Sequence, residues 1–471
     1  MIEPSRPQLS FAEGLIREEV GSLWEEWMRQ VDAVLADPEL VRIVYEALAR
    51  RWPQSRTRGR PGTPAEVVLR LLLLKHMRNW SYCVLEREVR ANLVYRQFTR
   101  VGAEKVPDAK TLGKLAVALG PQIVAQIHQR VVAIAREKQI VRGRRLRLDT
   151  TVVETHIHYP TDSSLLGDGV RVLTRTMKRI VQIAGRTGTR LRDRSRAVGY
   201  RAMEIARASR SRVPQGQERM KVCYRKLLYH TARVVGQANR FAYEVATGIK
   251  RGRGMTQQLS LQAARANLER MIPLVQQVMH QTRERLFKGN THVPGKLVSL
   301  FEPHTEVIRK GKAAKPTEFG KMVKIQEAEQ QIVTHYEVYD TRPNDCDLLL
   351  PAIEVHEQLL GRKPYLVTAD AAFFSQRNET VAHARGVKRV AIPNRSSKSA
   401  QRKRLQKKRW FRNAQKWRTG CEGRISLLKR RHGLNRCHYK GMPGIQRWVG
   451  FGVIADNLIN IGHVLAALSE G

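Results

Sequence analysis

Apolar positions recur at the spacing of a helix through the first part of the chain. Within residues 1–55 they form two runs that predict a helical segment. A further pair of helices is predicted from Val67 to Lys75 and from Ser81 to Leu93, with a turn between them at Asn79-Trp80. We therefore expect an all-α N-terminal part, with a first segment over 1–55 and a helical domain over 56–135.

The pattern changes to an alternation of strands and helices after residue 140. The predicted strands are Arg144 to Glu154, two strands in Lys321 to Tyr339 joined near Glu329-Gln330, Tyr365 to Asp370, and Lys388 to Ile392. Helices are expected between them, from Asp347 to Leu360 and from Ala371 to Ala384. Residues 140–162 and 301–442 thus predict an α/β core, interrupted by a mostly helical insertion over 163–300.

The longest apolar stretch lies near the end of the sequence, from Trp448 to Leu468. It contains Asp456, Asn457, Asn460 and His463, which would be costly on a lipid-facing helix. We therefore expect residues 443–471 to form a buried helix, and no membrane partner. The first twenty residues show no signal-peptide pattern, and five widely spaced cysteines are typical of reduced thiols in a cytoplasm.

Charge indicates what such a protein binds. The chain of 471 residues holds 85 Lys and Arg against 42 Asp and Glu, a formal net charge of +43. Residues 1–50 are acidic, with ten acids and five bases, whereas residues 161–300 hold 28 bases and 8 acids. With 42% apolar residues the chain has enough apolar side chains for a folded core. The excess of positive charge therefore indicates a surface that binds a polyanion, by default a nucleic acid.

Three acids lie where a catalytic site could be built. Asp149 belongs to the strand RLRLDTTVVE, and Asp370 ends the apolar strand YLVTAD just before a predicted helix. Catalytic groups in α/β sheets commonly occupy such strand ends, although an Asp there also serves as a helix cap. Glu422 lies on a predicted helix beside an apolar stripe, with Arg418 and Lys429 within about 40° of it around the helix. An ordinary ion pair between Arg418 and Glu422 is the alternative interpretation.

The basic positions expected to contact DNA form three groups. The peptide Arg58-Gly59-Arg60-Pro61 resembles an arm that lies in a minor groove, and the helix pair after it resembles a helix-turn-helix unit. Residues 395–418 hold eleven bases and no acid directly before Glu422, with aromatic residues between them; a solvated linker is the alternative. The predicted DNA-binding residues are Arg58, Arg60, Arg402, Lys403, Arg404, Lys407, Lys408, Arg409, Trp410, Arg418 and Lys429.

These motifs together resemble the DDE transposases of bacterial insertion sequences. Arg418, Glu422 and Lys429 match the Arg-(3)-Glu-(6)-Lys motif of that family, although its usual Tyr is replaced by Gln415. The stretches LDTTVVETHIHYPTDSSLLGDGVRVL, SLFEPHTEVIRKGKAAKPTEFGKMVKI and RWVGFGVIADNLINIG are similar to the ISNCY-type group, so the resemblance extends over about residues 58–468.

The resemblance implies a ribonuclease-H-like catalytic core and a catalytic triad of Asp149, Asp370 and Glu422. Three carboxylates offer hard oxygen ligands for two Mg²⁺ ions, for which Mn²⁺ would substitute, with Asp149 as the bridging ligand. The implied reaction is cleavage at the transposon ends followed by transfer of the 3′-hydroxyl into target DNA.

The resemblance also implies the partners and the compartment. The partners would be double-stranded DNA, at the terminal inverted repeats and at the target, and a second copy of the chain in a synaptic homodimer. The compartment would be the bacterial cytoplasm, on the nucleoid when the protein is active. Two other functions stay open: a metal-dependent DNA nuclease of the same fold, and a non-catalytic DNA-binding protein derived from a transposase.

Overall fold

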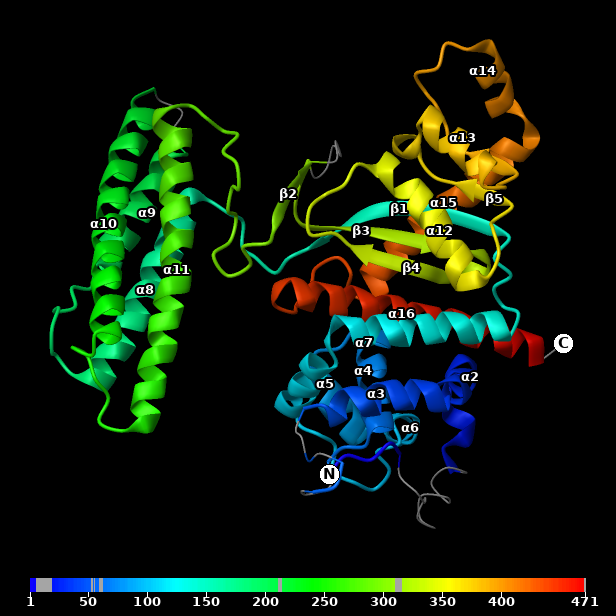
Figure 1. The fold of residues 1–471 in the computed structure, drawn as a ribbon, viewed down its shortest axis with the longest axis horizontal. Coiled ribbons are helices and arrows are strands. Elements are labelled where there is room, and N and C mark those ends of the chain that lie inside the picture. Colours follow the sequence, from blue (N-terminus) through cyan, green and yellow to red (C-terminus); the bar gives the residue numbers. More distant parts are fainter. Residues whose placement is uncertain are drawn as a thin grey trace. The chain divides into compact units, whose positions relative to one another are not determined.

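The computed structural model describes residues 1–5, 19–51, 54, 56–58, 62–210, 214–309 and 316–469. The chain divides into two compact units (Figure 1). Unit 1 consists of Met1–His156 and Ile308–Gly471, and unit 2 of Ile157–Val307. Each unit has its own buried apolar cores, so the two are described separately below.

The N-terminal part of unit 1 is helical, as the apolar spacing predicts. Its helices are η1 (Gly21–Leu23), α2 (Glu26–Leu35), α3 (Pro38–Ala49), α4 (Ala65–Met77), α5 (Tyr82–Ala91), α6 (Leu93–Phe98) and α7 (Ala109–Glu137). Asp37, Ser81, Asn92 and Asp108 cap the helices that follow them with side-chain oxygens. Nearly all of α4 is buried, so this helix forms the centre of the helical core.

The C-terminal helix α16 (Gly441–Ser469) packs against α2, α4 and α7. It is the one helix among the described residues with the length and apolar composition to cross a membrane, and 61% of that apolar window is buried within the structure. Asp456 and Asn457 lie on its buried part. This burial agrees with the core helix that the polar residues of the sequence predict.

The sheet of unit 1 contains both antiparallel and parallel strands. They are β1 (Arg145–Glu154), β2 (Glu306–Arg309), β3 (Thr317–Glu327), β4 (Val333–Val338), β5 (Leu366–Thr368) and β6 (Arg389–Ala391). Their order is β2-β3-β1-β5-β6, and β4 also pairs with β3. β1 is antiparallel to β3 and β3 to β4, whereas β1, β5 and β6 run parallel. The mixed α/β class predicted from the sequence is therefore confirmed.

Helices cover both faces of this sheet. They and the short 3-10 turns are η2 (Glu329–Gln331), η3 (Asp345–Leu348), α12 (Leu349–Leu360), η4 (Ala371–Phe373), α13 (Gln376–Ala384), α14 (Ala400–Lys407) and α15 (Arg409–Arg431). Leu146 and Leu148 of β1 join an apolar cluster with α12, whereas Val153 joins one with α15 and α16. The alternation of β1 thus places Asp149 on the α15 face.

The predicted helix over Ala371–Ala384 is wrong in its first third. After the short turn η4, the chain is extended at Phe374 and Ser375, and α13 begins only at Gln376. The Ser375 side chain accepts a hydrogen bond from the backbone N–H of Asn378 and so caps α13. The cap signal of this serine decides where the helix begins.

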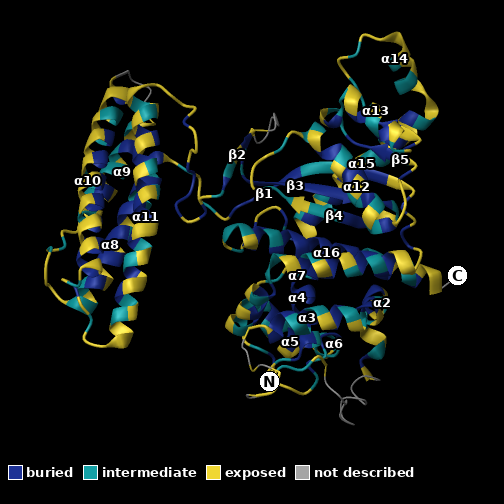
Figure 2. Ribbon diagram, in the orientation of Figure 1, coloured by how far each residue is buried: buried dark blue, intermediate teal, exposed yellow. Residues whose placement is uncertain are grey.

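Unit 2 is built from four long helices. They are α8 (Asp162–Ala184), α9 (Ser195–Ala208), α10 (Pro214–Ala246) and α11 (Met255–Phe287). Their inward positions form one continuous apolar cluster, and exposed positions recur along the other sides of the helices (Figure 2). The helix predicted from Leu259 to Lys288 is α11, which begins one turn earlier.

Candidate active site

The register of two parallel strands brings Asp149 and Asp370 together. In the pairing of β1 with β5, Arg147 lies opposite Thr368. Continued by two residues, this register places Asp149 level with Asp370, which directly follows the strand. Both acids line a cavity of about 770 Å³, and Glu422 of α15 lines it as well. The three acids of the predicted triad therefore share one cavity, although they are far apart in the sequence.

Asp149 and Asp370 each accept a hydrogen bond from a nearby backbone N–H. An Asp149 oxygen accepts a hydrogen bond from the backbone N–H of Thr150 at 2.7 Å. An Asp370 oxygen accepts one from the N–H of Ala372 at 3.0 Å, so this residue caps η4, as the alternative interpretation expects, while also lining the cavity. The Glu422 side chain is 58% exposed, more than the side chains of Asp149 and Arg418.

Arg418 connects two of these carboxylates. Its Nη2 donates to Glu422 Oε1 at 2.8 Å, and its Nη1 lies 3.8 Å from Asp149 Oδ2. The ion pair expected within the helix is therefore present, and it also reaches the strand acid. Only 13% of the Arg418 side chain is exposed, so a guanidinium partly shielded from water offsets the charge of the acids.

Arg147 of β1 forms a buried ion pair with Glu327 of β3 and also contacts α15. Arg147 donates to Glu327 and to the backbone oxygen of Trp417, and its guanidinium lies 4.7 Å from the centre of the Trp417 ring. Burial raises the pKa of Glu327, while the neighbouring Arg147 lowers it. Burial also raises the pKa of the Cys421 thiol well above its usual range, so this residue beside Glu422 remains protonated rather than acting as a nucleophile.

Gln415 stands where the family motif has a tyrosine, and it joins α15 to the sheet. Its amide donates to Thr368 Oγ1 at 3.0 Å and to the backbone oxygen of Ala391. Trp417, two residues further along α15, packs against Arg147. Neither side chain lines the cavity, so both support the helix instead.

Further residues, all but one of them polar, complete the cavity wall. Lys429, a predicted DNA-binding residue, is among them, together with Thr150, Thr151, Ile425, Ser426, Arg430 and Asn435. Ser426 lies one turn beyond Glu422, so helical spacing could have identified it. Asn435 could not be found in this way, because it comes close through the pairing of Glu154 with Arg436.

The donor types suit a hard divalent cation, but the side chains are not gathered around one point. Among the described residues, no group of three or more His, Cys, Asp or Glu side chains is close enough to hold a metal ion. Carboxylate oxygens are the ligands that Mg²⁺ and Mn²⁺ prefer. Asp149, Asp370 and Glu422 would have to converge, and Arg418 would have to move from between two of them, to ligate an ion.

The predicted DNA-binding residues of the basic stretch differ in their surroundings. Five of them are exposed and have no ion pair with a described acid; these are Lys403, Arg404, Lys407, Lys408 and Arg409. Arg402 differs, because its Nη1 bonds both oxygens of Glu379 at 2.6 and 2.7 Å and only 11% of its side chain is exposed. Arg402 is thus bound internally and leaves the cationic surface to its neighbours.

The remaining predicted contacts are placed as follows. Trp410 is half-buried, with the Arg389 guanidinium 5.1 Å from the centre of its ring. Arg58 is exposed, whereas Arg60 lies outside the described residues. On α5, Arg87 and Arg90 pair with acids of the same helix, so this helix presents little unpaired positive charge.

Two family models match the chain, and both describe transposases. Residues 25–116 match the family described as Transposase domain (DUF772), and residues 377–461 match the family described as Transposase DDE domain. The second match contains Glu422, Arg418 and Lys429 and begins after Asp370. No curated protein and no solved structure matches the chain.

The class is therefore that of transposases, enzymes that act on DNA. More specifically, the chain is a DDE transposase of an insertion sequence. Such a domain carries out phosphoryl transfer on DNA, and this family generally uses divalent metal ions.

Proposed function

We propose that Asp149, Asp370 and Glu422 are the catalytic triad of this transposase. The observation that carries the assignment is the shared cavity: three acids from β1, from the end of β5 and from α15 line the same 770 Å³. Lys429 and Arg430 line it too, so cations lie where a phosphate would enter. Carboxylate and cationic side chains together suit a site that binds a DNA phosphate next to metal ions.

The fold around the triad is, in this proposal, a ribonuclease-H-like core. What supports it is the path β4-β3-β1-β5-β6, in which antiparallel pairing gives way to parallel pairing at β1. One acid lies on this central strand and another at the end of its parallel neighbour. The insertion between β1 and β3 then corresponds to unit 2.

Asp149 would be the shared ligand of two Mg²⁺ ions, with Asp370 and Glu422 as the outer ligands and Mn²⁺ as a substitute. Bound divalent ions supply Lewis-acid activation of the attacking oxygen and stabilisation of the leaving one. Arg418 offsets the charge of Asp149 and Glu422 when no ion is bound, and its release from them leaves a cation for the DNA backbone. Lys429 orients the phosphate from the same helix.

The proposed reaction is cleavage at the terminal inverted repeats of the element and transfer of the freed 3′-hydroxyl to target DNA. The DNA that enters the cavity would be contacted by five exposed bases, which are Lys403, Arg404, Lys407, Lys408 and Arg409. The last of them, Arg409, is the first residue of α15. A homodimer would hold the two ends, and the compartment would be the bacterial cytoplasm.

The test is cleavage of DNA carrying the inverted repeats that flank the gene, with Mg²⁺ and with Mn²⁺. Asp149→Asn, Asp370→Asn and Glu422→Gln should each lower the cleavage rate by about a hundredfold or more, while DNA binding persists. Glu357→Gln is the matched control, since Glu357 lies on α12 outside the cavity and 46% of its side chain is exposed. Wild-type cleavage by any of the three variants would remove that residue from the triad.

The same assay separates the alternatives. A nuclease of this fold would cut the repeats without joining the 3′-hydroxyl to a second duplex. A non-catalytic DNA-binding protein would bind the inverted repeats but would not cut them with either Mg²⁺ or Mn²⁺.

A further inference from the structure

Unit 2 packs its helices at intervals of seven residues. On α10 the positions Tyr224, Thr231, Ala238 and Val245 are all buried at 3% exposure or less. A seven-residue repeat remains aligned with its neighbours only in a gently supercoiled bundle. Residues seven positions apart on α10 therefore form straight rows along the helix, on its outer side as well as on its inner side.

One of the outer rows consists only of bases. Arg219, Lys226, Arg233 and Arg240 are each seven residues apart, and all four are exposed. At 1.5 Å per residue they stand about 10.5 Å apart and span about 31 Å. The neighbouring row contains Tyr229 and Tyr243, whose exposed fractions are 59% and 66%. Exposed positions recur along α10 in Figure 2.

The acids of this unit do not neutralise the row. Unit 2 contains ten acids, and the eight within residues 161–300 are each ion-paired with a base other than these four. The pairs are Asp162–Arg285, Asp168–Arg171, Asp193–Lys178, Glu204–Arg201, Glu218–Lys221, Glu244–Lys250, Glu269–Arg265 and Glu284–Lys288. The row is thus a line of positive charge, since none of its four bases belongs to an ion pair among the described residues of the unit.

We propose that this row of α10 binds the sugar–phosphate backbone of double-stranded DNA over about one helical turn. A turn of B-DNA is about 34 Å long, close to the length of the row, and phosphates are what exposed Arg and Lys bind independently of sequence. The two tyrosines beside the row can donate hydrogen bonds to phosphate or sugar oxygens. The choice of DNA over other polyanions rests on the proposed function, and the binding itself needs no catalytic centre.

The experiment measures binding of the full-length protein to a 30-base-pair duplex of arbitrary sequence, in EDTA, across a range of salt concentrations. The test variant carries Arg219→Gln, Lys226→Gln, Arg233→Gln and Arg240→Gln. Each lost phosphate contact lowers the slope of log K against log salt by about 0.9. The slope should therefore decrease by about 3, with an unchanged melting temperature because all four side chains are exposed.

A control variant removes the same charge elsewhere in the unit, with Arg171→Gln, Arg201→Gln, Arg265→Gln and Lys288→Gln. These bases are already paired with acids, so the slope should change by less than about 1. An equal decrease in both variants would assign the effect to net charge and overturn the proposal. The proposal would also be overturned if the test variant left the slope unchanged, or if it weakened binding to single-stranded RNA but not to the DNA duplex.

This result is independent of the catalytic assignment. If the protein fails to cut DNA but its salt slope depends on the α10 row, the catalytic proposal is contradicted and the role of α10 is not. A protein that cuts at the wild-type rate with an unchanged slope would contradict the role of α10 alone.

Discussion

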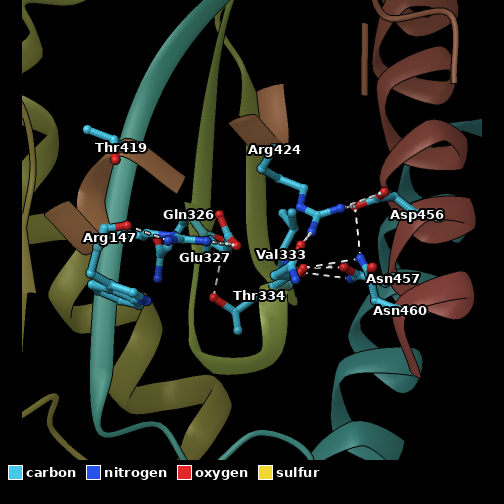
Figure 3. A network of polar contacts seen from close by, with 12 residues as sticks. Arg147, Gln326, Glu327, Val333, Thr334, Thr419, Arg424, Asp456, Asn457 and Asn460 are labelled. Atoms are coloured by element: carbon cyan, nitrogen blue, oxygen red, sulfur yellow. Dashed lines mark hydrogen bonds and ion pairs between the residues drawn. The ribbon is translucent and has the colours of Figure 1, made fainter. Parts of the chain in front are cut away.

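A buried ion pair connects α15 to α16 (Figure 3). Nη1 of Arg424 donates to both oxygens of Asp456 at 2.9 Å, and its Nη2 donates to Gln331. The Arg424 and Asp456 side chains are only 2% and 3% exposed. Removing one member of such a pair leaves the other as an uncompensated buried charge.

The expected loss follows from what remains around Asp456 in Arg424→Met. Removing one partner of a buried pair costs about 3–5 kcal/mol. His432 Nε2 lies 3.4 Å from Asp456 Oδ1, and Asn460 Nδ2 donates to Oδ2 at 3.2 Å. Because these contacts persist, we expect the lower end, a decrease of about 3 kcal/mol in the free energy of unfolding.

Asp456→Asn leaves the buried Arg424 guanidinium without its charged partner, with Gln331 and the new amide oxygen as acceptors, so we expect a loss of about 3–4 kcal/mol. In the double variant Arg424→Met/Asp456→Asn no buried charge is left from the pair. At least half of the summed loss should therefore be recovered, which makes the two positions strongly coupled.

Urea denaturation of the four proteins of this cycle measures the coupling. Arg42→Met is the control, because its pair with Glu39 has exposed fractions of 62% and 42% and should contribute less than about 1 kcal/mol. A loss below about 1 kcal/mol for Arg424→Met, or a double variant that loses the full sum, would refute the reasoning.

Two further predictions concern the core and the packing of α15. Burial lowers the pKa of His128 to about 4 in the folded protein, whereas an unfolded histidine has a pKa near 6.5. Between these two values the unfolded state binds the proton and the folded state does not. The free energy of unfolding should therefore fall as the pH decreases from about 6.5 to about 4. His128→Gln keeps a donor for the backbone oxygen of Val333, and urea denaturation at pH 7.5 and 5 should show a flatter dependence; an unchanged one would contradict this origin. Gly420→Ala would place a Cβ 3.0 Å from Cζ of the buried Arg147, which should cost about 1–3 kcal/mol in thermal unfolding and slow DNA cleavage. Gly423→Ala meets nothing within 4 Å and is the control; equal effects of both alanines would exclude the steric cause.

Much of the sheet and of the candidate site was predictable from local pattern. β1, β4, β5 and β6 lie within the predicted strands, and β3 begins four residues before the predicted Lys321, because alternation and flanking turn residues are local signals. Asp149, Asp370 and Glu422 were found from their places at a strand, a strand end and a helix edge, and the structure brings them to one cavity. Their roles remain a proposal.

What the sequence could not provide are pairings across long separations. Arg147 bonds Glu327, which lies 180 residues away, and Asn435 reaches the cavity from a segment after α15. Arg402 was expected to face DNA because it lies in a stretch of eleven bases and no acid, whereas in the structure it is bound by Glu379 of α13. No periodicity contains such information, since it depends on how separate elements pack.

Glu422 and Arg424 show how one helix carries both kinds of feature. They lie two residues apart on α15, so they point about 200° apart around its axis. Glu422 faces the cavity, and Arg424 faces the buried contact with α16. Arg424 therefore cannot touch the DNA and can affect cleavage only through the position of the helix. Conversely, Glu422→Gln removes the proposed metal ligand without disturbing the buried pair, so under the proposed function it should abolish cleavage at nearly unchanged stability. The two faces of α15 can thus be separated by measuring stability and cleavage on the same variants.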